Sequence, residues 1–244
     1  MWKIIVAVLV FFIALNYKKS DLLALVGCAF AKQNKADKAM KLYSIAEKFG
    51  SLSVGNRIRY ADLLLESGDE ENANSRFSIL AMENISDAQR VKLAEHHCKY
   101  YLKSNDYNTA IEMLEGVLDK CMTQKTCELL GAFYLLNENL ATALHFNTEA
   151  YEMFGDNPHI INNLAYTYLL TSDYENAAEY YNKLFCLTPD FPEGYFEYGK
   201  YLIENGETNK GIGCVKQALD CKFDFTTKVT KEEIENYLQQ CQNN

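Results

Sequence analysis

The sequence predicts an all-α protein built from a repeated helix pair, and three observations carry this prediction. Proline and glycine together supply only 15 of the 244 residues, about half of their usual share of roughly 12%. Hydrophobic residues make up 48% of the chain, which favours a folded core over disorder. Small residues also return about every 34 positions. The scarcity of turn residues disfavours a β-sandwich or a β-barrel.

Residues 1–19 are predicted to form a membrane anchor. An apolar run extends without a break from Ile4 to Leu15, between two aromatic residues and with lysines outside them. This arrangement suits a membrane interface. The run is short, because a bilayer core needs about 20 helical residues, so a cleaved signal sequence is the alternative. The residues expected to lie in the bilayer include Ile4, Leu9, Phe11, Phe12 and Leu15.

Charge next to the apolar run predicts the orientation of this anchor. Lysines 18, 19, 32 and 35 follow the run, whereas only Lys3 precedes it. Because positive residues stay on the cytoplasmic side, the repeats are expected to be cytoplasmic. Residues 25–28 have the form of a bacterial lipobox ending at Cys28, but charged residues precede it and disfavour lipidation.

Two series of small residues define the repeat. One series is Ala39, Ala73, Ala110, Ala143, Ala177 and Gly211. The other stands twelve residues upstream and consists of Gly27, Ala61, Cys98, Gly131, Ala165 and Gly199. Small side chains at both positions let two helices cross closely in every unit. We therefore expect all of them to be packing positions.

This pattern resembles the tetratricopeptide repeat, which reads W-x2-L-G-x2-Y, then A-x3-F, then P over 34 residues. The best copy is Ile161, Leu164, Ala165, Tyr168, Ala177, Tyr181, Leu184 and Pro189. The resemblance implies a right-handed α-solenoid of six repeats over 20–53, 54–90, 91–123, 124–157, 158–191 and 192–225. Arg57 in the tryptophan position and Asn147 in a large apolar position depart from the family pattern.

Polar residues mark the starts of several helices. Asp69, Asp106 and Asp173 each follow a short polar turn and are expected to cap the second helix of a repeat. After the repeats, Thr230 and Glu233 form a capping box. The apolar residues that follow are spaced as on one helical face: Ile234, Tyr237, Leu238 and Cys241. Residues 226–244 are therefore predicted to form a capping helix and tail.

Catalytic and metal-binding patterns are missing from the sequence. It contains no nucleotide-binding glycine loop, no nucleophile elbow and no zinc-protease motif. The eight cysteines lack the spacing of zinc ligands. His96 and His97 point in different directions on a helix, so packing is the preferred interpretation. We expect no enzyme activity, no metal and no cofactor, and the net charge of −9 disfavours nucleic-acid binding.

The resemblance also implies a concave groove, lined by the first helix of each repeat, that binds a protein or peptide. Spacing places nine candidate residues there: Lys92, Lys99, Lys125, Asn162, Tyr166, Leu169, Leu170, Phe196 and Lys200. The aromatic and apolar members among them are expected to form an exposed patch, unless the C-terminal cap folds back over it. The carboxylate clamp of the chaperone-binding members is not reproduced.

The sequence thus predicts a non-catalytic, membrane-anchored adaptor that binds a partner in its groove. Residues 124–244 carry 8 basic and 18 acidic residues, so electrostatic steering of a basic partner segment is expected there. An exported periplasmic or cell-surface repeat protein is one alternative. A scaffold that assembles with copies of itself, as a homo-oligomer, is another.

Overall fold

The computed structural model describes residue 8 and residues 19–223 and 227–243. The predicted anchor residues Ile4, Leu9, Phe11, Phe12 and Leu15 lie outside the described residues. Within the described part of the chain, no helix combines the length and the apolar character that crossing a membrane requires.

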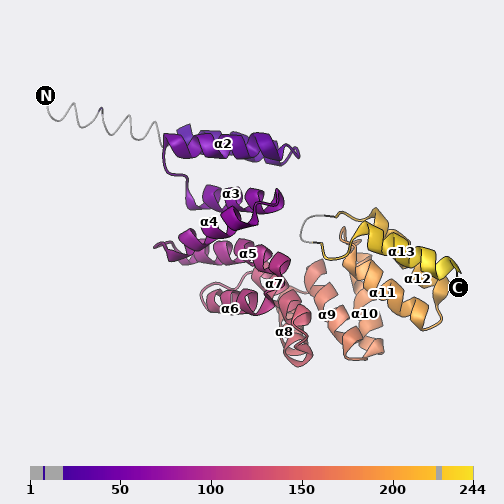
Figure 1. Ribbon diagram of the computed structural model, residues 1–244. Helices are drawn as coiled ribbons and strands as arrows, with labels where there is room; N and C mark the ends of the chain where they lie inside the picture. Colours follow the sequence, from indigo (N-terminus) through magenta and orange to yellow (C-terminus); the bar gives the residue numbers. More distant parts are fainter. Residues whose placement is uncertain (1–7, 9–18, 224–226, 244) are drawn as a thin grey trace. The chain divides into compact units, whose positions relative to one another are not determined.

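The chain divides into two compact units, Met1–Tyr100 and Tyr101–Asn244. In unit 1, residues 19–31 are helical. The helices α2 (Ala36–Phe49), α3 (Val54–Glu66), α4 (Glu70–Met82) and the larger part of α5 (Asp87–Ser104) follow. The helix α3 packs against both α2 and α4 (Figure 1).

Unit 2 continues with the end of α5 and eight further helices, which form two layers (Figure 1). These helices are α6 (Tyr107–Leu118), α7 (Gln124–Leu136), α8 (Leu140–Phe154), α9 (Pro158–Leu170), α10 (Tyr174–Cys186), α11 (Glu193–Glu204), α12 (Thr208–Asp220) and α13 (Lys231–Asn243). One layer contains α7, α9 and α11, and α9 contacts both of the others. The helices α6, α8, α10 and α12 pack behind this layer.

The small residues of both series are buried. Ala39, Ala73, Ala110, Ala143, Ala165 and Ala177 are fully inaccessible to solvent, and the paired glycines are buried too. The approach is very close between α11 and α12, where a Cβ on Gly211 would stand 2.6 Å from the carbonyl oxygen of Gly199. Glycine is needed there because real Cβ atoms do not approach backbone so closely.

The turns between the two helices of a repeat share one backbone feature. Their middle residue has a left-handed conformation, with φ of 57° at Asn105, 57° at Glu138 and 62° at Ser172. Glycine occupies the corresponding position at Gly68 and Gly206. Left-handed backbone costs least at glycine, so glutamate and serine at this place are held there by the packing of the helices on either side.

The predicted caps form in two of the three turns. The side chain of Asp106 accepts a hydrogen bond from the backbone N–H of Thr109, and that of Asp173 accepts one from Asn176. The Asp69 side chain makes no such bond to the backbone. It accepts instead from the side-chain amide of Asn72 at 2.9 Å, so the prediction of a cap there is wrong.

Both departures from the repeat pattern have structural partners. The Arg57 guanidinium forms a two-pronged ion pair with Glu83, both bonds being 2.7 Å long. Asn147 is fully buried and donates to the hydroxyl of Thr167 at 3.2 Å. A Cβ on Gly131 would stand 2.0 Å from the Asn147 side-chain oxygen, so the glycine makes room for the amide.

The helix α13 covers the end of unit 2. It packs against α12, and Ile234 and Leu238 enter a cluster with Val215 and Ala218 of that helix. Glu233 donates its backbone N–H to the Thr230 hydroxyl at 3.1 Å, as expected for the start of a capped helix.

Candidate functional site

The candidate site is a surface of unit 2 formed by one layer of helices. We call it the A-helix face and define it by accessible side chains of α7, α9 and α11: Lys125, Glu128, His159, Asn162, Tyr166, Glu193, Glu197 and Lys200. All of these residues are partly or fully exposed. Their helices lie side by side, because α9 contacts both α7 and α11.

Glu197 is the most unusual charge of the A-helix face. Burial raises the pKa of its carboxyl group, and the nearby acidic groups of Glu233 and Glu204 add to the rise. The ammonium group of Lys200, 3.6 Å from a carboxyl oxygen of Glu197, acts in the opposite direction. Because burial prevails, this carboxylate would gain stability from a further cation.

Two phenols stand beside this carboxylate. Burial, assisted by the charge of Glu197, raises the pKa of Tyr166 to about 12. Burial also raises the pKa of Tyr181, which is fully enclosed, and its hydroxyl has no hydrogen-bond partner among the described residues. Both phenols therefore stay neutral at physiological pH and can serve only as hydrogen-bond groups.

Asn162 also has an acceptor group. Its side-chain oxygen is buried and has no hydrogen-bond partner within the described part of the chain. The residue facing it on α11 is Gly194, where a Cβ would stand 2.6 Å from this oxygen. An unpaired buried oxygen is costly, and because this one is closed off from solvent it is not available to a ligand on the surface.

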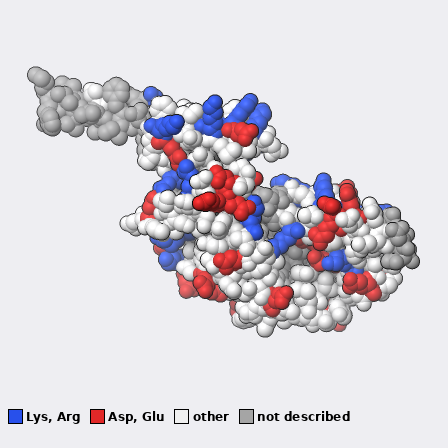
Figure 2. All heavy atoms as spheres, in the orientation of Figure 1, with Lys and Arg blue, Asp and Glu red and all other residues white. Residues whose placement is uncertain are grey.

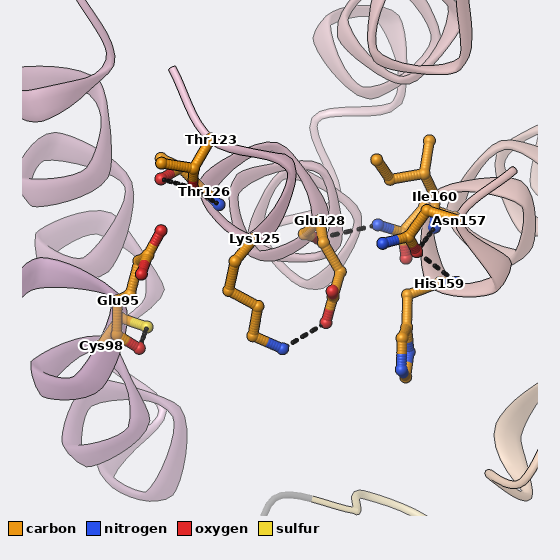
Figure 3. Close-up of polar contacts among 10 residues, drawn as sticks. Glu95, Cys98, Thr123, Lys125, Thr126, Glu128, Asn157, His159 and Ile160 are labelled. Atoms are coloured by element: carbon orange, nitrogen blue, oxygen red, sulfur yellow. Dashed lines mark hydrogen bonds and ion pairs between the residues drawn. The ribbon is translucent and has the colours of Figure 1, made fainter. Parts of the chain in front are cut away.

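The α7 portion of the A-helix face is ordered by polar contacts (Figure 3). The ammonium group of Lys125 lies 2.5 Å from a carboxyl oxygen of Glu128. The backbone carbonyl of Glu128 accepts a hydrogen bond of 2.9 Å from the side chain of Asn163 on α9. Asn157 caps α9 by accepting from the backbone N–H groups of His159 and Ile160. Of these contacts, the bond between Asn163 and Glu128 joins the two helices and fixes the register of α7 against α9.

A cleft of about 410 Å³ adjoins the A-helix face where α11 meets α13. Its wall includes Lys200 on one side and Glu232 and Glu233 on the other. The Lys200 ammonium also lies 5.1 Å from the centre of the Phe196 ring. Lys200 is therefore held by neighbours and does not extend freely into solvent.

Phe196 does not belong to an exposed patch, and that part of the prediction is wrong. Its side chain is only 2% exposed and meets Tyr237 of α13 edge-on, with ring centres 5.7 Å apart. The apolar side of α13 needs a buried counterpart, and Phe196 provides it. Leu169 is half-buried against the cluster around Tyr181, whereas Leu170 is 40% exposed.

The two α5 residues predicted to line the groove, Lys92 and Lys99, lie in unit 1 and therefore do not belong to the A-helix face. Lys92 is exposed. The Lys99 ammonium lies 3.3 Å from one carboxyl oxygen of Asp62 on α3, and the ring of His96 contacts the other oxygen. This lysine already has an acidic partner within the chain. It therefore differs from the accessible basic group that the sequence predicts for a groove.

His97, which follows His96 in the sequence, is a core residue, as its position in the repeat predicts. His97 is 4% exposed and stacks on Phe77, with ring centres 4.9 Å apart. Burial lowers its pKa to about 4, so the ring is neutral at physiological pH. Among the described residues, no group of three or more potential ligands is placed to hold a metal ion.

Comparison with known proteins agrees with this architecture. A tetratricopeptide-repeat protein from Parabacteroides merdae has a similar fold, with a TM-score of 0.73 and 17% identity over 91% of this chain and 84% of its own. Residues 158–191 match the family model of the tetratricopeptide repeat. Residues 158–191 thus form a tetratricopeptide repeat, and the chain as a whole has the fold of such repeats. A search of curated proteins found no matching sequence.

Two further structures share this tetratricopeptide-repeat fold. The pilF protein of Pseudomonas aeruginosa is similar with a TM-score of 0.69 and 11% identity, over 92% of this chain and 99% of its own. A thermophilic tetratricopeptide-repeat protein of Thermus thermophilus has a TM-score of 0.63 and 15% identity, over 79% of this chain and 100% of its own. At such identities the likeness concerns the fold alone.

Several polar pairs in the structure were not predicted from the sequence, although their separation along the chain is a signal that could have identified them. Asp62 and His96 are 34 positions apart, and Asn163 and Glu128 are 35 apart. Residues separated by one repeat length lie on neighbouring first helices. Polar residues at that separation can therefore be searched for as contacts.

Proposed function

We propose that this tetratricopeptide-repeat protein is a non-catalytic scaffold whose A-helix face in unit 2 binds an extended, basic segment of a partner protein. The observation that carries the proposal is the partly buried Glu197 carboxylate, whose raised pKa indicates that Lys200 does not offset the cost of its burial. A lysine or arginine of a partner would improve the environment of this carboxylate.

Two features support a peptide as the ligand. The carboxyl group of Glu193 already accepts a hydrogen bond from the backbone N–H of Lys228, so this face can bind the N–H groups of an extended backbone. Unit 2 contains 10 lysines and 22 acidic residues, so its field attracts a basic segment. Such attraction increases the association rate and makes binding sensitive to salt.

Fluorescent Gly/Ser decapeptides that carry either three lysines or three glutamates test this proposal on the full chain. We expect the lysine peptide alone to bind, more weakly at high salt, and the Glu197→Gln variant to lose at least fivefold in affinity. The matched control is Glu152→Gln, which removes an exposed carboxylate from α8. Equal binding of both peptides, or indifference to Glu197→Gln, would refute the proposal.

We further propose that unit 1 is attached to a membrane on the cytoplasmic side, through the apolar run Ile4 to Leu15. The described helix over residues 19–31 supports this. Its side chains Leu22, Leu25 and Val26 are 61%, 57% and 43% exposed and share one helical face. Exposed lysines stand nearby in the chain, and those of α2 are visible in Figure 2. Apolar residues with lysines around them suit an anionic lipid surface.

Tryptophan fluorescence provides the test, because Trp2 is the only tryptophan in the sequence. In a Trp2→Phe background, Leu25→Trp on the full chain should be quenched by brominated lipids in anionic vesicles. The control Ile79→Trp replaces a similarly exposed residue, at 52%, on α4. Quenching at position 79 alone, or at neither position while the chain is bound, would contradict the proposed contact.

The two alternatives have their own measurements. Intact mass of the native protein distinguishes an anchor from a cleaved signal sequence, since only the anchor retains residues 1–19. Light scattering over a range of protein concentrations tests self-assembly, which predicts a mass that rises with concentration.

A further inference from the structure

The segment 227–230, which precedes α13, reaches back to the first helix of unit 2. Lys228 donates its backbone N–H to a carboxyl oxygen of Glu193 on α11 at 3.1 Å. Its ammonium group donates to the hydroxyl of Tyr107 on α6 at 2.7 Å. The two residues of this second contact are 121 positions apart in the sequence.

The Tyr107 side chain is arranged to receive an ammonium group. Its hydroxyl donates to the side-chain oxygen of Asn105 at 2.7 Å, which leaves its lone pairs for the lysine. The ammonium nitrogen also lies 4.3 Å from the centre of the Tyr107 ring, within the range of a cation–π contact. The Phe133 ring, tilted at a centre distance of 6.3 Å, supports the tyrosine from α7. The Lys228 ammonium group thus contacts the hydroxyl and the ring face of Tyr107 at the same time.

The Lys228 side chain can leave this position without moving the backbone of its segment. Lys228 is exposed, whereas the adjacent Val229 is 7% exposed and belongs to the cluster beneath α13. Val229 therefore fixes the segment, while the lysine side chain is held only by solvent-accessible contacts. Such contacts are individually weak and readily exchanged.

We propose that Asn105 and Tyr107 form a lysine-recognition subsite, which Lys228 fills within the free protein and which a lysine of an extended partner segment takes over on binding. This proposal rests on the proposed peptide-binding function of unit 2 and names one residue that the partner must carry. Glu193, beside the backbone of Lys228, connects the subsite with the A-helix face. Lys228 then acts as an internal competitor, because a partner lysine has to displace it and therefore binds more weakly than it would to an empty subsite.

Fluorine NMR of full chains that carry 3-fluorotyrosine at position 107 reports directly on this subsite. The probe is the peptide Gly-Ser-Thr-Lys-Val-Thr-Gly-Ser, which contains residues 227–230, together with the same peptide with alanine in place of lysine. Lys228→Ala should shift the fluorine resonance, and the lysine peptide should restore it. The wild-type chain should need at least fivefold more peptide for a comparable change.

Two controls accompany this experiment. Lys231→Ala should behave as wild type, because Lys231 lies over the ring of Phe223, 5.1 Å from its centre. Circular dichroism should show equal helix content in all variants. No response of the Lys228→Ala chain to the lysine peptide, or an equal response to the alanine peptide, would overturn the subsite. Either result would leave the Glu197-dependent binding intact, so the two proposals fail separately.

Discussion

Gly199 and Gly211 place the backbones of α11 and α12 in direct contact, since a Cβ on Gly199 would stand 2.9 Å from the carbonyl oxygen of Gly211. No other pair in the two series of small residues consists of two glycines. The last repeat therefore has no room for an added methyl group at Gly199 unless its two helices move apart.

Gly199→Ala should destabilise unit 2, because α11 and α12 must separate to accept the new side chain. The expected loss is about 1 to 3 kcal/mol, typical of overpacking in a core. Gly213→Ala on α12 is the matched control, since a Cβ there meets nothing within 4 Å. Urea unfolding should show the control equal to or more stable than wild type, and equal loss in both variants would contradict the assigned contact.

His97 should make the stability of unit 1 depend on pH. Its pKa is about 4 in the folded protein and about 6.5 in an unfolded chain. The unfolded state alone takes up this proton between those values, so stability is lost as pH falls from about 6.5 to about 4, by up to roughly 3 kcal/mol. His97→Leu, which introduces the family's own residue, should flatten the urea-unfolding profile in this window. An unchanged profile would exclude His97 as its cause.

Phe196 and Tyr166 should respond differently to alanine substitution. Because Phe196 is 2% exposed beneath α13, Phe196→Ala should cost about 3 to 5 kcal/mol. Tyr166 is only partly buried on the A-helix face, so Tyr166→Ala should cost clearly less while still reducing binding of the lysine decapeptide. Thermal unfolding followed by circular dichroism compares the two. Equal melting temperatures would show that α13 does not cover Phe196 in solution.

Glu138→Gly should stabilise the turn between α7 and α8. Glu138 has φ of 57°, and a residue other than glycine pays about 1 kcal/mol or more for that backbone. Part of this gain is offset because glycine makes the unfolded chain more flexible. Glu149→Gly, in the middle of α8, should instead destabilise by about 1 kcal/mol. A decrease in melting temperature for Glu138→Gly would contradict the turn geometry.

The repeat could be predicted from sequence because its packing depends on small residues at fixed spacing. Wherever Ala177 and its equivalents occur, two helices must cross closely, whatever surrounds them. The cap could be predicted for a similar reason, since Ile234 and Leu238 mark one face of a helix that has to be buried. Such local patterns can be recognised in the sequence without knowing which distant residues come into contact.

Contacts with a segment that folds back from a distant part of the sequence could not be predicted in this way. Phe196 has the spacing of a groove residue, and only the position of α13 decides that it is buried. The raised pKa of Glu197 arises from burial and from two acidic neighbours, of which Glu233 comes from α13. The contact between Tyr107 and Lys228 joins residues 121 positions apart, without the one-repeat separation that identifies neighbouring helices.

The position of α13 also limits how copies of this chain can join. Ile234 and Leu238 bury the apolar side of α12, to which another repeat would otherwise be added. Head-to-tail growth of a filament needs such an open end at every step. Filament growth through the C-terminal end would require α13 to detach first, so truncation before residue 231 is the change expected to promote polymerisation.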